Sequence, residues 1–329
     1  MRTAYVLGAG ASISATEQRD GTSSMPATSS VFAEAARRGH VDERKHSHLI
    51  DYAKRYFHQD LTDPRNAINA EDLLTNLQLD IERLNSAPDA ASMRHAQEII
   101  AHTIRDAQKG SLGKLTGGEY DRLLLRACPD KSAANPILTF NWDILLDQQM
   151  AQDDRFDLLR RSLSSGVLQG QRVSQAHRRP AYLKLHGSVD WRRCSVRHCT
   201  LANSVNPTMD STKCSACGNT TDIVIVPPTS NKRLFTDVTI QRAWTIAADH
   251  LERASKLVVW GYSLPATDFA ARWLLRHIGI EAPLEGVDVI DKCPDPVKGR
   301  FMEVLATRVA SENVRTFRSF SEWEKAHDS

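Results

Sequence analysis

The sequence lacks any long hydrophobic run and any strong excess of charge of one sign. No stretch of about 18 apolar residues occurs, so the sequence predicts no membrane span. The 42 Lys and Arg residues almost balance the 40 Asp and Glu residues, which leaves a formal net charge of +2. A net charge this small does not by itself indicate nucleic acid or an anionic membrane as a partner.

Cysteine is also scarce, and the N-terminus does not read as a secretory signal. Six cysteines among 329 residues are too few for a disulfide scaffold. Gly8 and Gly10 interrupt the first apolar residues, and polar residues follow at once, which is unlike the hydrophobic region of a signal peptide. We therefore expect a cytoplasmic protein that has no membrane as a partner.

Hydrophobic residues make up 41% of the chain and charged residues 25%, as is typical of a globular protein with a sizeable core. The length predicts two domains, or one large domain with an insertion. Short apolar runs alternate with helical segments, which predicts an α/β fold with a Rossmann-like, doubly wound parallel sheet. The predicted strands are Thr3–Leu7, Pro136–Phe140, Ala181–His186, Asp222–Pro228, Lys256–Ser263 and Gly286–Asp291.

A helical insertion is predicted at about residues 30–130. Its segment "AEDLLTNLQLDIERL" has Leu73, Leu77 and Ile81 at helical spacing, and Asn69 precedes the segment as a helix cap. We expect this insertion to contribute packing and not chemistry. Residues 162–180 are expected to form a flexible polar connection.

The stretch "VLGAGAS" at residues 6–12 directly follows the first predicted strand. In nucleotide-binding folds a Gly-x-Gly turn lets the backbone approach a pyrophosphate, and the N-terminus of the next helix stabilises its charge. Ile13 replaces the third glycine of the full motif, so a purely structural turn is an alternative. Ser12 could likewise serve only as a helix cap.

Polar residues also follow other predicted strands, in "TFNWD" (139–143), "LHGSVDW" (185–191) and "WGYSLPATD" (260–268). The carboxyl ends of parallel strands meet at one edge of a sheet, so we expect these residues to form one ligand site. Taken singly, Asn141 could be a turn former and His186 a buried, hydrogen-bonded histidine. Asp291 could be a turn or helix-cap residue.

Four cysteines form two chelating pairs, Cys194-x4-Cys199 and Cys214-x2-Cys217. Four thiolates predict a closed, tetrahedral, structural Zn²⁺ site. We expect residues 194–217 to form a small zinc-binding module, and residues 1–193 and 218–329 to form the Rossmann-like domain.

Two alternatives to this zinc site stay open from the spacing alone. His198 could replace one cysteine as a ligand, or the cysteines could form a disulfide. The remaining cysteines, Cys128 and Cys293, are expected to be inert, small hydrophobic side chains.

The order and content of these motifs, from about Val6 to Asp291, resemble the sirtuin superfamily. They resemble more closely its divergent bacterial NAD-consuming branch, whose domains often serve in antiphage defence. The resemblance implies that the chain binds NAD and that the cysteine cluster is the zinc module of the family. The implied catalytic residues are Asn141 and Asp143 beside the nicotinamide ribose and His186 as general base. The implied NAD-binding residues are Gly8, Ala9, Gly10 and Ser12 around the pyrophosphate, and Gly261, Ser263 and Asp291 around the adenosine.

Three departures from the family weaken the prediction of peptide binding. "DGTSSMPATSSVF" replaces the G-I-P-D-F-R stretch of deacylating sirtuins, "VPPTSNK" replaces their F-G-E stretch, and Phe140 replaces the glutamine of T-Q-N. The sequence therefore predicts an NAD glycohydrolase that cleaves NAD to nicotinamide and ADP-ribose. An NAD-dependent protein deacylase or an ADP-ribosyl transferase is the alternative. A non-catalytic NAD sensor is disfavoured because Asn141 and His186 are both present.

Residues 155–197 contain ten Lys and Arg residues against Asp157 and Asp190 alone. Such a run is usually a solvated face, and the alternative is contact with nucleic acid or an acidic protein surface. Because unregulated NAD destruction would kill a cell, we expect a homo-oligomer or a partner protein to hold the enzyme inactive.

Overall fold

The computed structural model describes residues 2–17, 25–85, 87–109, 117–129, 134–156, 159, 181–196, 198–199, 206–207, 213–226, 238–278, 280–281 and 283–328. The predicted flexible connection at 162–180 and much of the basic segment at 155–197 lie outside these residues.

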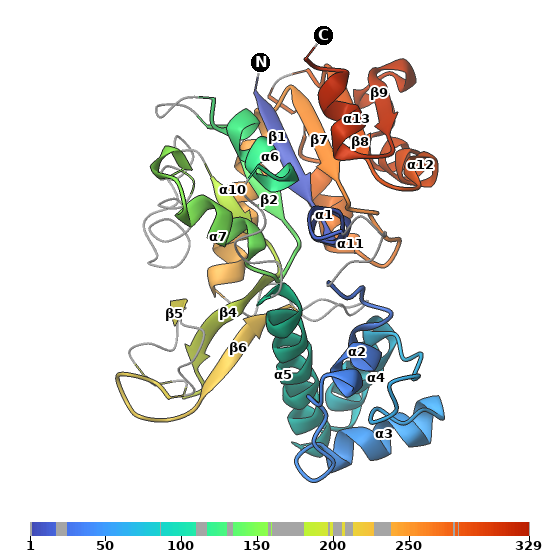
Figure 1. Cartoon of the computed structure of the whole chain (residues 1–329), viewed down its shortest axis with the longest axis vertical. Coiled ribbons are helices and arrows are strands. Elements are labelled where there is room, and N and C mark those ends of the chain that lie inside the picture. The colour runs from blue at the N-terminus through green and yellow to red at the C-terminus, as the bar shows by residue number, and fades with distance from the viewer. Residues whose placement is uncertain are drawn as a thin grey trace.

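The centre of the fold is a six-stranded parallel sheet in the order β3-β2-β1-β7-β8-β9 (Figure 1). Most of its strands coincide with predicted ones: β1 (Thr3–Leu7), β2 (Ile137–Thr139), β3 (Tyr182–Lys184), β7 (Lys256–Trp260) and β8 (Gly286–Ile290). The last strand, β9 (Val314–Phe317), is additional to those predicted. The doubly wound, Rossmann-like fold is confirmed.

Side chains alternate between the two faces of this sheet, and helices cover both faces. Tyr5 and Trp260 belong to the core on one face, and Val6 and Val259 to the core on the other. Burial on both faces explains why the strands read as continuous apolar runs. The helices packed on the first face are α1 (Ala9–Ala15), α6 (Glu119–Ala127), α7 (Leu145–Ala151) and α13 (Phe320–Lys325). Those on the second are α10 (Val238–Glu252), α11 (Phe269–Leu275) and α12 (Pro294–Leu305).

The helical insertion gathers around its longest helix and lies beyond one edge of the domain (Figure 1). It contains α2 (Val31–Arg37), α3 (Ser47–Phe57), α4 (Ala70–Leu84) and α5 (Ala87–Lys109). The predicted cap of α4 is confirmed, because Asn69 Oδ1 accepts a hydrogen bond from the Glu71 backbone N–H at 2.9 Å. Short 3₁₀ helices lie elsewhere, at Asp154–Phe156, Ala306–Arg308 and Ser311–Asn313.

A separate antiparallel sheet has the order β5-β4-β6 and contains β4 (Gly187–Cys194), β5 (Asn206–Pro207) and β6 (Thr221–Ile225). This sheet corrects two expectations. Residues 222–225 of the apolar run predicted at 222–228 join this sheet and not the parallel one, and residues 187–191 form a strand and not a loop. An apolar run predicts a strand but does not specify its partner. Helix α5 packs on this sheet, where Gln97 Nε2 donates to the Ile225 carbonyl at 3.3 Å.

None of the helices in the described part of the chain has the length and hydropathy needed to cross a membrane.

Candidate active site and zinc site

A cavity of about 360 Å³ lies at the carboxyl ends of β1, β2, β3, β7 and β8. The β1 strand has β2 on one side and β7 on the other, so the cavity is at the point where open α/β sheets bind ligands. Its volume is in the range of about 300–1,000 Å³ typical of small-molecule sites. The predicted site residues that line it are Ala9, Gly10, Ser12, Asn141, Asp143, His186, Gly261, Ser263 and Asp291.

Three glycines hold the turn after β1 tightly against the turn after β7. A Cβ atom on Gly8 would lie 2.5 Å from the Gly261 carbonyl oxygen, and one on Gly10 would lie 2.8 Å from Gly261 Cα. The Gly10 N–H donates to the Gly261 carbonyl at 2.9 Å. Backbone packing is therefore a sufficient reason for the Gly-x-Gly pair, and Gly8 is not among the residues that line the cavity.

Ser12 is the centre of a buried hydrogen-bond network. It lies inside α1, where Gly8 is the N-cap residue, so the alternative that Ser12 caps the helix is wrong. Its hydroxyl donates to Asp143 Oδ2 at 2.6 Å and accepts from Asn141 Nδ2 at 2.9 Å. The Tyr120 hydroxyl lies 2.8 Å from the same Ser12 oxygen. Ser12 thus joins the residues that follow β1 to those that follow β2.

Asp143 is buried and its pKa is raised. Burial is the main cause, and the neighbouring Lys184 ammonium and the Ser12 hydrogen bond oppose it. Asp143 Oδ1 accepts from the Leu145 backbone N–H at 3.1 Å, so both carboxylate oxygens have protein partners. The fully buried Lys184 ammonium donates to the Asp143 carbonyl and lies 3.0 Å from Asp147 Oδ2. Asp143 is therefore anchored from several sides, and its place beside the nicotinamide ribose stays a prediction.

His186 is surrounded by aromatic rings between β3 and β4. Its ring centroid is 4.9 Å from that of Phe140, edge to face, and 6.3 Å from that of Trp244. Phe140 in turn stacks on Tyr262, with centroids 4.2 Å apart and ring planes 14° apart. Trp244 Nε1 donates to the Leu185 carbonyl at 2.8 Å, which fixes the indole. Phe140 therefore places an aromatic ring beside His186.

Ser263 and Asp291 line the cavity from the turns after β7 and β8. Asp291 Oδ1 accepts from the Cys293 backbone N–H at 2.9 Å, so Asp291 forms a turn. The Ser263 carbonyl accepts from Arg300 Nε at 2.7 Å. Asp291 therefore has the turn role considered as an alternative and also a position on the cavity wall.

The helical insertion takes part in the site, contrary to the expectation that it only packs. Val31 of α2, Glu71 of α4 and Ile104 of α5 line the cavity, and so does Met25 before α2. Helical spacing identifies a buried face but not what that face contacts, so no local pattern indicates these residues. Tyr120 is a further residue of the site that the sequence analysis does not name, and it contacts Ser12. Its residue type is a signal of such a contact, because a buried tyrosine hydroxyl usually has a hydrogen-bond partner.

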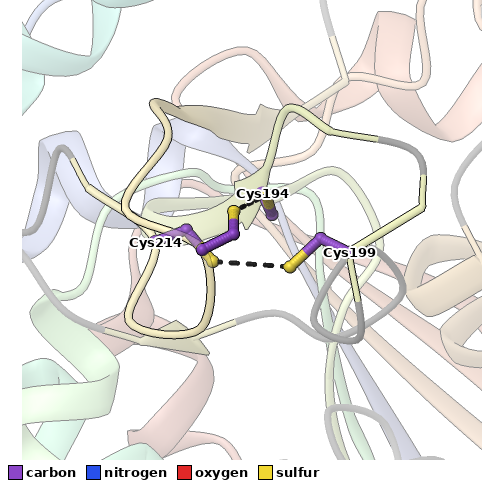
Figure 2. Close-up of side chains that lie close together, drawn as sticks. Cys194, Cys199 and Cys214 are labelled. Atoms are coloured by element: carbon purple, nitrogen blue, oxygen red, sulfur yellow. Dashed lines mark hydrogen bonds between the residues drawn. The ribbon is translucent and has the colours of Figure 1, made fainter.

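The four predicted zinc ligands come together between the end of β4 and the turn before β6. Their Sγ atoms all lie within 4.8 Å of one another. The Sγ atoms of Cys194 and Cys217 are 3.5 Å apart, and those of Cys199 and Cys214 are 3.7 Å apart (Figure 2). Tetrahedral thiolate ligands about 2.3 Å from a zinc ion are about 3.8 Å from one another. The four thiols therefore fit a structural zinc site.

The alternatives to this site find no support in the geometry. His198 is exposed and is not among the clustered ligand atoms. All six cysteines fall in the described part of the chain, and none is in a disulfide. Asn219 Nδ2 donates a hydrogen bond to Cys217 Sγ at 3.4 Å, which favours the thiolate that zinc binds. Cys128 is buried and Cys293, the N-cap residue of α12, is exposed, and the inertness of both stays a prediction.

The chain is similar to solved Sir2 structures. A Sir2 homologue in complex with NAD is 14% identical, with 99% of this chain and 86% of that chain covered and a TM-score of 0.44. A mutant Sir2 homologue in complex with ADP ribose is 13% identical, with 99% and 93% covered and a TM-score of 0.44. Sir2Tm bound to a propionylated peptide is 14% identical, with 99% and 91% covered and a TM-score of 0.40. No family model and no curated protein sequence matches the chain.

Proposed function

We propose that the protein is an NAD glycohydrolase, which uses water to cleave NAD to nicotinamide and ADP-ribose with release of one proton. The observation that carries the proposal is that Asn141 and His186, which follow different strands, line the same cavity. The resemblance of the surrounding motifs to NAD-consuming sirtuin-like domains supports NAD as the ligand.

The reaction needs only a few groups from the protein. Cleavage of the bond between nicotinamide and ribose develops positive charge at the anomeric carbon, as in glycoside hydrolysis, and nicotinamide leaves without needing a proton. Asn141 orients a water or a ribose hydroxyl, and His186 accepts the proton that the water loses. Asp143 holds Ser12 and thereby the network around Asn141. The rings of Phe140 and Trp244 limit the access of bulk water to His186.

A protein deacylase is the second candidate, because it breaks the same bond of NAD and moves the acyl group of an acyl-lysine peptide, which leaves as free lysine, onto the ADP-ribose. An ADP-ribosyl transferase would transfer the ADP-ribose to a protein side chain. We place hydrolysis first because "DGTSSMPATSSVF" and "VPPTSNK" replace the stretches that deacylases carry beside their peptide. The same resemblance supports a regulated role in antiphage defence, with a homo-oligomer or a partner protein as the regulator.

The experiment is to incubate the purified chain with NAD and to separate the products by chromatography, with and without an acyl-lysine peptide and at several protein concentrations. We expect nicotinamide and ADP-ribose in equal amounts without peptide. Asn141→Ala and His186→Ala should each lower turnover by about 10²-fold or more. The matched controls are Asn76→Ala and His48→Ala, which change exposed residues of α4 and α3 and should retain full turnover.

Two results would contradict the proposal. Acyl-ADP-ribose that forms only when peptide is present would assign the protein to the deacylases. Full turnover in both the Asn141→Ala and the His186→Ala proteins would show that the reaction takes place elsewhere.

A further inference from the structure

We propose that Tyr120 is a positioning residue for Asn141 and that it acts through Ser12. This inference rests on the proposed function, since it identifies the group that holds the proposed catalytic asparagine in one orientation. Tyr120 belongs to α6, in the segment whose sequence predicts only packing.

Two adjacent side chains of α6 fix this helix to α1. The Ser14 hydroxyl donates to Glu119 Oε2 at 2.7 Å, and the Tyr120 hydroxyl lies 2.8 Å from Ser12 Oγ. Tyr120 is 1% exposed, and its ring stands edge-on to Trp260 with centroids 5.4 Å apart. Both the ring and the hydroxyl of Tyr120 are therefore confined to one position.

The orientation of the Asn141 amide follows from its partners. The Gly8 carbonyl can only accept, so the Asn141 atom 2.9 Å from it must be the donor Nδ2. The second Nδ2 hydrogen is donated to Ser12 Oγ. Oδ1 accepts no hydrogen bond from any residue that the structure describes. What Asn141 can still offer to a ligand is therefore an acceptor, and a hydroxyl or a water is the partner that fits it.

The direction of the hydrogen bond between Tyr120 and Ser12 follows from the number of donors and acceptors around the Ser12 hydroxyl. A serine hydroxyl has one proton and two lone pairs. The proton goes to the Asp143 carboxylate and one lone pair accepts from Asn141, so the other lone pair is left for the Tyr120 proton. Burial raises the pKa of Tyr120 well above its usual value, so the phenol keeps this proton. Tyr120 therefore completes the hydrogen bonding of Ser12.

Removal of the Tyr120 hydroxyl would leave one lone pair of Ser12 without a donor. The serine hydroxyl would still donate to Asp143, but its oxygen would be positioned less firmly, and so would the Asn141 amide that donates to it. A hydroxyl or a water bound at Asn141 Oδ1 would lose its orientation. Loss of orientation slows the reaction more than it weakens binding.

The test is Tyr120→Phe, which removes the hydroxyl and keeps the ring. We expect kcat to fall by about 10-fold while KM changes by less than about twofold. The matched control is Tyr52→Phe, which removes a hydroxyl that donates to Asp80 Oδ2 at 2.6 Å between α3 and α4. Tyr52 does not line the cavity, so kcat and KM should both stay at the wild-type values.

A double variant tests whether Tyr120 acts through Asn141. If it does, Tyr120→Phe has no further effect in the Asn141→Ala background, and kcat of the double variant equals that of Asn141→Ala alone. A further loss of about 10-fold in the double variant, or a wild-type kcat in Tyr120→Phe, would overturn the inference.

Calorimetric titration with ADP-ribose separates this inference from the proposed function. If the wild type releases no nicotinamide from NAD, the proposed function fails and the inference is decided by affinity for ADP-ribose. Weakening by Tyr120→Phe that disappears in the Asn141→Ala background would support the positioning role. Additive weakening, or no binding of ADP-ribose to the wild type, would overturn it.

Discussion

At Gly261 the turn after β7 packs against the turn after β1, with backbone atoms in direct contact. Its φ of +64° is in the left-handed region, and a Cβ atom there would overlap the Ala11 backbone nitrogen. Gly261→Ala therefore combines backbone strain of about 1–2 kcal/mol with a steric conflict of about 1–3 kcal/mol. We expect the free energy of unfolding to fall by about 2–5 kcal/mol, measured by urea denaturation.

Gly39 after α2 is the matched control for this change. Its φ is +72°, and a Cβ atom there would have no neighbour within 4 Å. Gly39→Ala should therefore lose only the strain of about 1–2 kcal/mol. Equal losses in the two variants would mean that close backbone packing at Gly261 contributes nothing to stability.

Among the elements, β4 connects the cysteine cluster to His186, which lines the cavity. It begins at Gly187, next to His186, and ends at Cys194, and β6 pairs with it after the second cysteine pair. Metal binding by thiolates supplies folding free energy, about 10 kcal/mol or more in zinc fingers.

We expect one zinc per chain, and Cys217→Ser should release it and expose β4 and β6 to hydrogen exchange. Metal analysis and exchange of residues 187–194 and 221–225 measure these effects.

Cys293→Ser is the control for the zinc experiment, because Cys293 is exposed and lies outside the cluster. This variant should keep its zinc and the protection of both strands. Full zinc content in Cys217→Ser would mean that another group takes the fourth position. A wild type without zinc would exclude the metal site.

At the scale of the whole molecule, Asp288 connects the C-terminal helix α13 to the parallel sheet through hydrogen bonds and ion pairs. Its side chain is 1% exposed and accepts from Arg315 Nε at 2.8 Å and from Trp323 Nε1 at 2.9 Å, and Lys256 Nζ lies 3.1 Å away. Burial opposes ionisation, but the hydrogen bonds and positive charges, first those of Arg315, outweigh burial and hold the pKa of Asp288 below its usual value. Strands β7, β8 and β9 and helix α13 thus share one buried charge.

Asp288→Asn should lower the free energy of unfolding at pH 7 by about 1.5–3 kcal/mol, because it removes the buried charge that strengthens the hydrogen bonds from the half-exposed Arg315 and from Trp323. The pKa of Asp288 is lower in the folded than in the unfolded chain. Its contribution is therefore complete above the unfolded pKa of about 4 and is lost as the pH falls through the folded pKa. Urea denaturation should give a constant difference from the wild type between about pH 5 and 8, and a smaller one below about pH 4.

The surface carboxylate Asp63, which pairs with the exposed Arg65, is the control. Asp63→Asn should change stability much less at pH 7, because water already solvates both charges. A difference for Asp288→Asn that persists unchanged in acid would show that packing, and not charge, is responsible.

How far the sequence predicts each element depends on how that element is buried. The parallel strands are buried on both faces, so β1 (Thr3–Leu7) and β7 (Lys256–Trp260) read as apolar runs and are predicted correctly. β9 has only four residues, and buried Val314 and Phe317 enclose exposed Arg315 and half-buried Thr316, so it has neither an apolar run nor an alternation that would identify it. The run that forms β6 is recognisable as a strand, but its antiparallel partner is not.

By itself, the sequence determines the features that depend on nearby residues. The glycine turn at Gly8 and Gly10, the polar residues that end β2 and β3, and the spacing of the four cysteines all follow from positions close in the chain. Only the tertiary structure decides that Tyr120 forms a hydrogen bond with Ser12 and that residues of α2, α4 and α5 line the cavity. Strands, turns and chelating pairs are set by local geometry. The partner of a buried hydroxyl is set by the packing of segments more than one hundred residues apart, which no local pattern records.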